Sequence, residues 1–338
     1  MQKLLNRFSF LCLLLFSANS VSVYAQSDFS NLVIFGDSLS DTGNIANAII
    51  GLPFPYYQNR ISNGPVAVDF FAAQLGFDAR AAQHIGGPID GYNYAVAGGN
   101  ILGSDLEDLT TQVSSYLTRV NNVADPNALY IAFMGGNDVR GVRGILSEQA
   151  ANIEIELILD GLFEQLTRLT NAGAQTLLVS NVPNVGQVPE TLQREVNDPG
   201  ISERAALYSR TYNARLSQRL DAFAQSTNTN IVLFDIYAQL DTIIRTADQL
   251  GFTQTDVGCF DIDEVDFDFN FDAFHPDCVF GLFFDRFVFF DNIHPTSKAH
   301  QIVGQGMLDS LSQLDEQPPI EEPSKSAIVI PAILLLLE

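Results

Sequence analysis

The alternation of short apolar runs with longer amphipathic stretches is the feature that most constrains how this chain folds. The short runs are rich in Val, Ile, Leu and Phe, which is typical of strands buried on both faces of a sheet. Between them lie stretches in which apolar residues recur at helical spacing. The predicted strands are residues 32–35, 129–134, 176–179 and 231–234, and the predicted helices are residues 105–120, 145–170 and 201–225.

This order of elements predicts a parallel sheet that is covered by helices on both faces. Parallel neighbours need long crossover connections, and these are usually helical. We therefore predict an α/β fold, a three-layer α/β/α sandwich with a parallel, flavodoxin-like sheet. In such sheets the reactive groups gather beyond the carboxyl ends of the strands, so chemistry is sought in the residues that follow each apolar run.

The start of the chain has the pattern of a secretory signal peptide. Lys3 and Arg7 precede an apolar run, and small or polar residues follow up to Ala25, where we expect cleavage. The run is too short to span a membrane as a helix, which takes roughly 20 residues. We therefore predict a signal peptide at residues 1–25, export to the periplasm or the medium, and one large domain at residues 26–314.

Residues 315–338 form a Pro- and Glu-rich linker that is followed by a short hydrophobic tail. The apolar stretch at residues 327–337 has about half the length of a membrane-spanning helix. It predicts at most a weak association with a membrane or with the cell surface. A packed or frayed terminal segment is the alternative.

The net charge of the chain limits its possible binding partners, and its cysteine content bears on disulfide formation in the compartment to which it is exported. Loss of Lys3 and Arg7 with the signal leaves 15 basic against 40 acidic residues, a net charge of −25, so we expect no nucleic-acid partner. Cys12 leaves with the same segment. The remaining Cys259 and Cys278 would enter an oxidising compartment, where a single pair predicts one disulfide, and two unpaired thiols are the alternative.

Acidic residues alternate with apolar ones, mostly Phe, from residue 261 to residue 272. The alternation favours an exposed strand with one acidic face. A calcium site is an alternative interpretation, because hard cations bind several carboxylate oxygens. The sequence does not show the loop geometry that such a site needs.

Three segments of the chain carry residues suited to acyl transfer. Ser38 lies on a turn after the first strand, in the segment 36–44, although a serine there often only caps a helix. A glycine turn at residues 97–99 offers backbone amides, and Asn137 offers a side-chain amide after another strand. Such donors can stabilise the oxyanion of a tetrahedral intermediate, and a serine would supply the nucleophile.

The base that a serine nucleophile needs has two candidates, because Asp-x-x-His-Pro occurs twice. One copy is Asp272 with His275, inside the acidic segment and between the two cysteines. The other is Asp291 with His294, just before an amphipathic stretch for which Thr296 is the expected N-cap. The fixed position before a helix favours His294 as the base and Asp291 as its orienting carboxylate.

Taken together, these residues resemble the GDSL (SGNH) hydrolases from about residue 31 to about residue 312, with all four sequence blocks in order. Ser38 matches the block I serine, and Asp291 with His294 matches the closing Asp-x-x-His. Gly98 and Asn137 match the glycine and asparagine of blocks II and III. The resemblance implies the SGNH hydrolase fold, and an oxyanion hole formed by the amides of Ser38 and Gly98 with the side chain of Asn137.

Residues 60–65 also resemble the segment that follows block I in the lipase-like branch of the family. Two features depart from that pattern. The branch often has Gly-Gly-Ala where this chain has Ala97-Gly98-Gly99, so Gly99 competes with Gly98 as the matching glycine. Phe290 stands where a Trp is often found beside the final Asp.

The sequence therefore predicts a secreted serine hydrolase that cleaves carboxylic esters, of a lipid, a short-chain acyl group or an acylated sugar, through an acyl-enzyme on Ser38. This scheme needs no cofactor and no metal. One alternative is a catalytically idle surface-binding module on the same fold. The other is a metal-dependent phosphoesterase; its ligands would be Asp37, Asn137, Asp138, Asp291 and His294.

Overall fold

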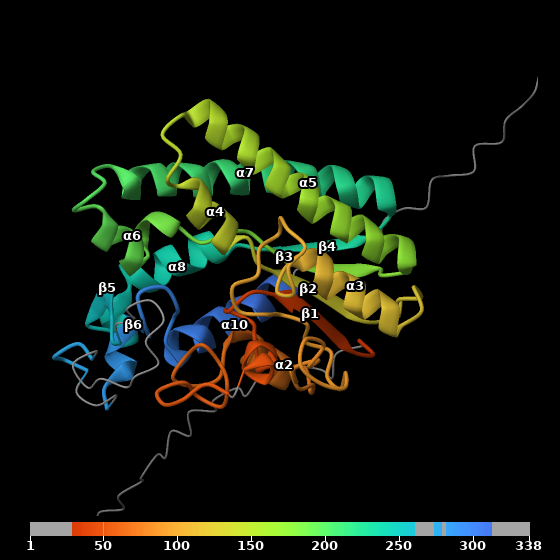
Figure 1. The fold of residues 1–338 in the computed structure, drawn as a ribbon, viewed down its shortest axis with the longest axis horizontal. Helices are drawn as coiled ribbons and strands as arrows, with labels where there is room; N and C mark the ends of the chain where they lie inside the picture. The colour runs from red at the N-terminus through yellow and green to blue at the C-terminus, as the bar shows by residue number, and fades with distance from the viewer. Residues whose placement is uncertain (1–28, 50, 261–273, 279–281, 313–338) are drawn as a thin grey trace, which may run out of the picture.

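A computed structural model describes residues 29–49, 51–260, 274–278 and 282–312 (Figure 1). Its main sheet has four parallel strands, which lie side by side in chain order. The strands are β1 (Leu32–Gly36), β2 (Leu129–Phe133), β3 (Thr176–Ser180) and β4 (Asn230–Phe234).

A fifth extended segment adds to the free side of β1. The Ile34 amide donates to Tyr92 O at 3.0 Å, and the Tyr94 amide donates back to Ile34 O at 2.7 Å, which makes a parallel bridge between Ile34 and Asn93. Counted in chain order, the five segments run 2-1-3-4-5 across the sheet. This is the flavodoxin-like order, so the predicted fold class is confirmed.

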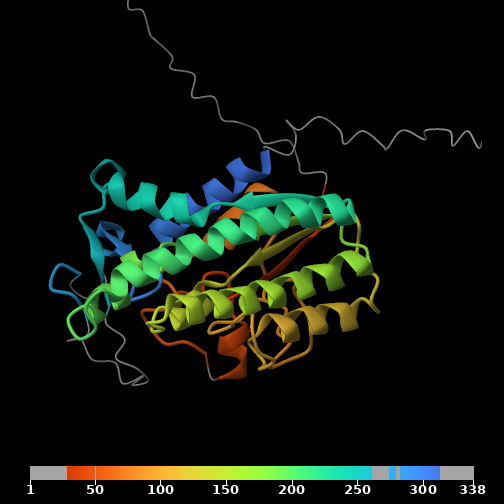
Figure 2. The ribbon, with the colours of Figure 1, turned by 90° about the horizontal axis from the view of Figure 1, so that it is seen from above.

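Successive residues of each strand enter opposite apolar layers, because side chains alternate along a strand. Val33 and Phe35 pack with one set of helices, and Leu32 and Ile34 pack with the other (Figures 1 and 2). The first set is α3 (Leu109–Arg119), α5 (Glu148–Ala172) and α7 (Ile201–Thr227), and the second is α2 (Ala67–Gln74), α8 (Ile236–Arg245) and α10 (Ser297–Ser312).

The four predicted strands and three predicted helices are confirmed, with shifts of a few residues at the ends. The prediction that every strand is buried on both faces was wrong for β4. Asn230 is exposed, and Ile231 and Leu233 are only partly buried. The reason is that β4 lies at the edge of the sheet and pairs only with β3 among the described residues.

A smaller unit precedes α10 in the chain. It pairs β5 (Gln254–Gly258) with β6 (Phe287–Phe289) and holds an aromatic cluster that includes Phe274, Phe284 and Phe290. Cys259 and Cys278 are joined there as a disulfide. The short helices of the fold are α1 (Asn44–Ala48), α4 (Gly136–Val142), η1 (Val185–Gln187), α6 (Pro189–Arg194), α9 (Ala247–Leu250) and η4 (Phe284–Arg286).

Several predictions concern parts of the chain outside the described residues. These are the signal peptide, the hydrophobic tail and the acidic segment with its open calcium site. Among the helices that are described, none combines the length and the apolarity of a membrane span.

Candidate active site

Ser38 lies on a tight turn directly after β1 and is 7% exposed. The Ser38 amide has no acceptor among the described residues, and the Ser38 side chain does not cap the following helix, α1. Asp41 does so instead, because its carboxylate accepts the amides of Gly43 and Asn44 at 2.7 and 2.6 Å. The alternative interpretation of Ser38 as a helix cap is therefore wrong. Gly36 is needed before the turn, since a Cβ there would lie 2.7 Å from Phe133 O on β2.

A chain of short contacts joins Ser38 to residues more than 250 positions away. His294 Nε2 lies 2.7 Å from Ser38 Oγ. On the other side of the ring, His294 Nδ1 lies 2.8 and 3.0 Å from the two carboxylate oxygens of Asp291, which is 2% exposed. The structure thus brings together the three residues that the sequence predicted as nucleophile, base and orienting acid.

Hydrogen bonds within the loop that carries His294 fix its shape. Asp291 Oδ1 accepts the backbone amides of Ile293 and His294, each at 2.7 Å. The Phe290 amide donates to His294 O at 2.7 Å. Thr296 then caps α10, as predicted, by accepting the Ala299 amide at 3.4 Å. The imidazole is therefore fixed from both sides before any substrate arrives.

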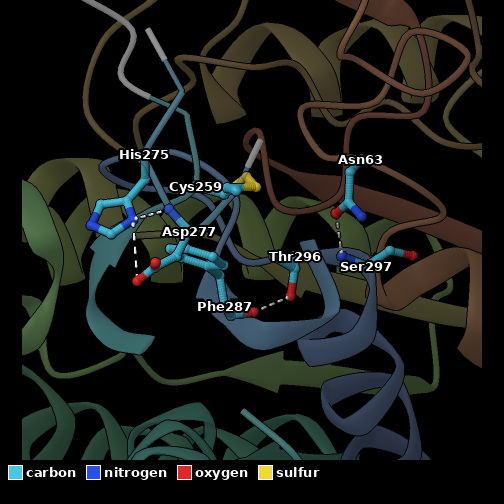
Figure 3. The surroundings of a disulfide bond; sticks show 8 residues. Asn63, Cys259, His275, Asp277, Phe287, Thr296 and Ser297 are labelled. Carbon is cyan, nitrogen blue, oxygen red and sulfur yellow. Dashed lines mark hydrogen bonds and ion pairs between the residues drawn. A yellow bond between two sulfur atoms is a disulfide. The ribbon is translucent and has the colours of Figure 1, made fainter. Parts of the chain in front are cut away.

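Residues 62–65 hold this loop down from a distant part of the sequence. Asn63 Oδ1 accepts the Ser297 amide at 2.9 Å (Figure 3). The loop also has a bond of its own, in which Thr296 Oγ1 donates to Phe287 O at 2.8 Å (Figure 3). Ser62 Oγ donates to Pro295 O at 2.9 Å. The family resemblance marked this segment in the sequence, but no local pattern indicated that it braces the base.

The second histidine candidate lies elsewhere. The amide of His275 donates to Cys259 O at 2.9 Å, and its ring accepts the Asp277 amide at 3.2 Å (Figure 3). The ring packs edge-on against Phe287, and the Asp277 carboxylate is 3.9 Å away. His275 makes no contact with Ser38, and its sequence partner Asp272 lies outside the described residues.

Asp41 ties the glycine turn to the segment that carries Ser38. One oxygen of its carboxylate accepts the Ala97 amide at 2.9 Å. The Gly99 amide is committed to the turn, because it donates to Val96 O at 3.1 Å. The Gly98 amide has no acceptor among the described residues. Gly98 also has a φ of +90°, a conformation that favours glycine.

Asn137 is the second residue of α4, the helix that follows β2, and its side chain is held at both ends. Nδ2 donates to Gly99 O at 3.0 Å, and Oδ1 accepts from Arg140 Nη1 at 3.1 Å. The side chain therefore bridges the glycine turn and α4, and Nδ2 keeps a second hydrogen for another acceptor.

Two buried carboxyl groups beside the site hold backbone amides. Asp37 accepts the Leu39 amide at 3.0 Å, and Asp138 accepts the amides of Ile101 and Leu102 at 3.0 to 3.2 Å. Burial raises the pKa of Asp37 to about 6 and that of Asp138 to about 7, against the opposing effect of these hydrogen bonds.

The metal-dependent alternative needs several ligands that converge on one point. Asp37 and Asp138 are instead occupied by separate stretches of backbone, and Asp291 is occupied by His294. Over residues 29–49, 51–260, 274–278 and 282–312, no three His, Cys, Asp or Glu side chains gather into a metal-binding group.

A groove of about 530 Å³ opens beside the glycine turn. Its lining is mainly polar and includes Gly98, Asn100, Asn137, Arg140 and Glu190. A polar part of a ligand would therefore fit next to the free amide of Gly98 better than an alkyl chain would.

Comparison with known proteins agrees with this site. Residues 32–307 match the family described as GDSL-like Lipase/Acylhydrolase. The chain is 30% identical over 310 residues to the thermolabile hemolysin of Vibrio parahaemolyticus serotype O3:K6, an alignment that covers 86% of this chain but 66% of the hemolysin. It is 30% identical over 256 residues to the phosphatidylcholine-sterol acyltransferase of Aeromonas hydrophila, covering 74% of this chain and 72% of that one. A GDSL esterase/lipase of Arabidopsis thaliana is 26% identical over 91% of this chain and 94% of its own length.

Proposed function

Because the chain belongs to the GDSL-like lipase/acylhydrolase family, we propose that it is a secreted carboxylic ester hydrolase that works through an acyl-enzyme on Ser38. The observation that carries this proposal is the contact chain from Ser38 Oγ through the His294 ring to the Asp291 carboxylate. A serine hydroxyl becomes a nucleophile when an imidazole takes its proton, and a carboxylate fixes that imidazole in the right tautomer.

In the first half-reaction Ser38 Oγ attacks the ester carbonyl carbon while His294 Nε2 takes the hydroxyl proton. The carbonyl oxygen becomes an oxyanion, which the amides of Ser38 and Gly98 and the Nδ2 group of Asn137 stabilise. The intermediate then collapses, the C–O bond to the alcohol breaks, and His294 returns the proton to the leaving alkoxide. Ser38 is left as an acyl ester.

In the second half-reaction water replaces the alcohol. His294 takes a proton from the water as its oxygen attacks the acyl carbon, and the same three donors stabilise the second oxyanion. Breakage of the bond to Ser38 Oγ releases the carboxylic acid, and the proton returns to the serine. No step calls for a cofactor or a metal ion.

We infer that the substrate is a small-molecule or lipid ester with a polar portion beside the reacting carbonyl. One relative, by its name, acts on phosphatidylcholine and a sterol, and another is an esterase/lipase. The polar groove beside Gly98 and Asn137 would hold such a portion. Rates on a panel of acetyl to palmitoyl esters, a phospholipid and an acetylated sugar would identify the class.

Export is part of the same proposal. The signal-like start of the sequence supports it, and so does the disulfide between Cys259 and Cys278, since such bonds persist in oxidising compartments. Cleavage after Ala25 in protein recovered from the periplasm or the medium would test it.

The nucleophile is tested by Ser38→Ala with Ser40→Ala as the matched control. Ser40 is two residues away, fully buried, and its Oγ has no hydrogen-bond partner among the described residues. We expect S38A to lower kcat on p-nitrophenyl butyrate by about 10⁴ to 10⁶ while S40A stays within a few-fold of the parent. A fluorophosphonate should label Ser38, and a chelator should leave the rate unchanged.

Each alternative function predicts a different outcome of that experiment. Ordinary turnover in S38A would refute the serine mechanism. Loss of activity with chelator would favour the metal-dependent phosphoesterase. A parent protein that turns over no ester in the panel would favour the idle binding module.

A further inference from the structure

Arg140 stands between the oxyanion donor Asn137 and a carboxylate. It lies in the last turn of α4, and its side chain is 29% exposed. Arg140 Nη1 donates to Asn137 Oδ1 at 3.1 Å, and Arg140 Nε donates to Glu190 Oε2 at 2.8 Å. The guanidinium group thus touches the side chain that is to bind the oxyanion, but not the reacting atoms.

The contact with Arg140 decides which end of the Asn137 amide faces the reaction. A side-chain amide has one accepting and one donating end, and rotation by half a turn exchanges them. An arginine carries donors only, so it can face only Oδ1. Gly99 O accepts from Nδ2 at 3.0 Å and favours the same rotamer. Together they aim the donating end toward the site, as electrostatic stabilisation of an oxyanion requires.

Glu190 holds Arg140 and also reaches the base-bearing loop. Its side chain is 14% exposed and accepts from Arg143 at 2.8 and 2.9 Å as well as from Arg140. Burial acts to raise the pKa of Glu190, but these hydrogen bonds outweigh it and lower the pKa to about 2. The backbone amide of Glu190 donates to Asn292 O at 2.8 Å, between Asp291 and His294. One residue therefore connects the oxyanion side of the site to the base side.

We propose that Arg140 is a positioning residue, which is held by Glu190 and acts on the reaction by fixing the orientation of the Asn137 amide. This inference rests on the proposed function, because it needs Asn137 to bind the oxyanion. It predicts that the loss of Arg140 lowers kcat by a larger factor than it raises KM, since the oxyanion exists only in the transition state and the intermediates, whereas the groove that Arg140 lines acts on substrate binding.

The test is a double-mutant cycle of Arg140→Met and Asn137→Ala in the full chain, with p-nitrophenyl butyrate as substrate. We expect N137A to lower kcat by about 10² to 10³. R140M should lower kcat about tenfold, the effect of losing one orienting hydrogen bond. In the N137A background, R140M should change kcat less than about twofold, because the residue it positions is already absent.

The matched control is Arg194→Met. Arg194 Nη2 lies 2.9 Å from the same Glu190 carboxylate, but the side chain is 53% exposed, and its hydrogen bonds go to Glu190 and not to Asn137. Arg194 also lines the polar groove, so the control is read in kcat and not in KM, and R194M should keep the parent kcat on p-nitrophenyl butyrate. If R140M does not fold, Arg140→Lys enters the same cycle, since an ammonium group keeps the charge but cannot make the planar pair of bonds.

The outcomes separate this inference from the function on which it rests. If N137A loses activity as expected but R140M keeps the parent kcat, or loses the same factor in both backgrounds, the positioning role is overturned and the proposed function stands. If N137A keeps the parent kcat, the oxyanion assignment fails and the positioning role fails with it. Equal losses in R140M and R194M would also overturn it, because general support of Glu190 would then explain both.

Discussion

The sharpest test of the catalytic geometry is the substitution Asp291→Asn. Asp291 Oδ1 accepts two backbone amides at 2.7 Å, and Asp291 Oδ2 lies 2.8 Å from His294 Nδ1. An asparagine can keep its oxygen on the two amides and place its NH₂ group where Oδ2 was. That group would donate to Nδ1 and force the ring proton onto Nε2, which lies 2.7 Å from Ser38 Oγ and could no longer accept the serine proton.

The wrong tautomer should lower kcat by about 10⁴, which corresponds to about 5 kcal/mol of transition-state stabilisation. The unfolding free energy should change by no more than about 1 kcal/mol, because the backbone bonds survive. Turnover of p-nitrophenyl butyrate and urea unfolding measure the two quantities.

The matched control is Asp277→Asn, beside the other histidine. Asp277 is 3.9 Å from the His275 ring, and its side chain is 61% exposed. D277N should therefore keep the parent kcat. Retention of more than about a tenth of the parent kcat in D291N, with correct folding, would refute the tautomer argument.

Three further predictions concern the histidines and the disulfide. His294→Ala should abolish turnover and His275→Ala should keep it, and the reverse result would reassign the base. Replacing Cys259 and Cys278 together by Ser should lower the unfolding free energy in urea by about 3 kcal/mol, because the bridge closes a loop with a sequence separation of 19; no change would refute its stabilising role. Burial lowers the pKa of His300 to about 3, so the unfolding free energy should fall as pH drops from about 6.5 toward 3, by up to about 1.4 kcal/mol per pH unit, and His300→Asn should remove that part of the slope.

The sign of the His300 prediction follows from which state binds the proton. The folded ring is neutral, with Nδ1 accepting the Ala67 amide at 3.2 Å. The unfolded ring takes a proton below about pH 6.5, whereas the folded ring resists it until about pH 3. Unfolding is therefore favoured by acid within that window and is unaffected by this group above it. A slope that is identical in the parent and in H300N would contradict the argument.

Much of the fold was predictable because the sheet is a local pattern repeated along the chain. The apolar runs mark strands wherever both faces of the sheet are covered, as at Val33 and Ile34. The pattern could not show that β4 lies at an edge. Ile231 and Leu233 are as apolar as their counterparts in β2. Their exposure depends on the position of β4 at the edge of the sheet that the described residues form, which only the assembled sheet reveals.

The candidate site also has residues that the sequence predicted and contacts that it could not predict. Ser38 and His294 stand next to recognisable turn and helix signals, so their roles could be predicted. The contacts of Arg140 and Glu190 could not, because the side chains that meet there are 50 positions apart in sequence and have no common pattern. The bracing of Ser297 by Asn63 spans 234 positions. Long-range hydrogen bonds between common residue types leave no periodic signal.

The match of residues 36–44 to the hydrolase motif continues past the nucleophile, and the contacts of Asp41 and Asn44 give a physical reason for this. Asp41 accepts amides from its own turn and from Ala97, and Asn44 Nδ2 donates to Asn93 O and Ala95 O at 2.8 and 2.7 Å. These two side chains therefore tie the segment that carries Ser38 to the segment that carries Gly98. In the proposed mechanism the amides of Ser38 and Gly98 converge on one oxygen, so their separation has to be fixed. Backbone hydrogen bonds from Tyr94 and Val96 to β1 already place the two segments side by side, and the side chains of Asp41 and Asn44 add further ties between them. We propose that the resemblance to a hydrolase motif extends to Asn44 because this side chain helps to hold the two amides of the proposed oxyanion hole at a fixed separation.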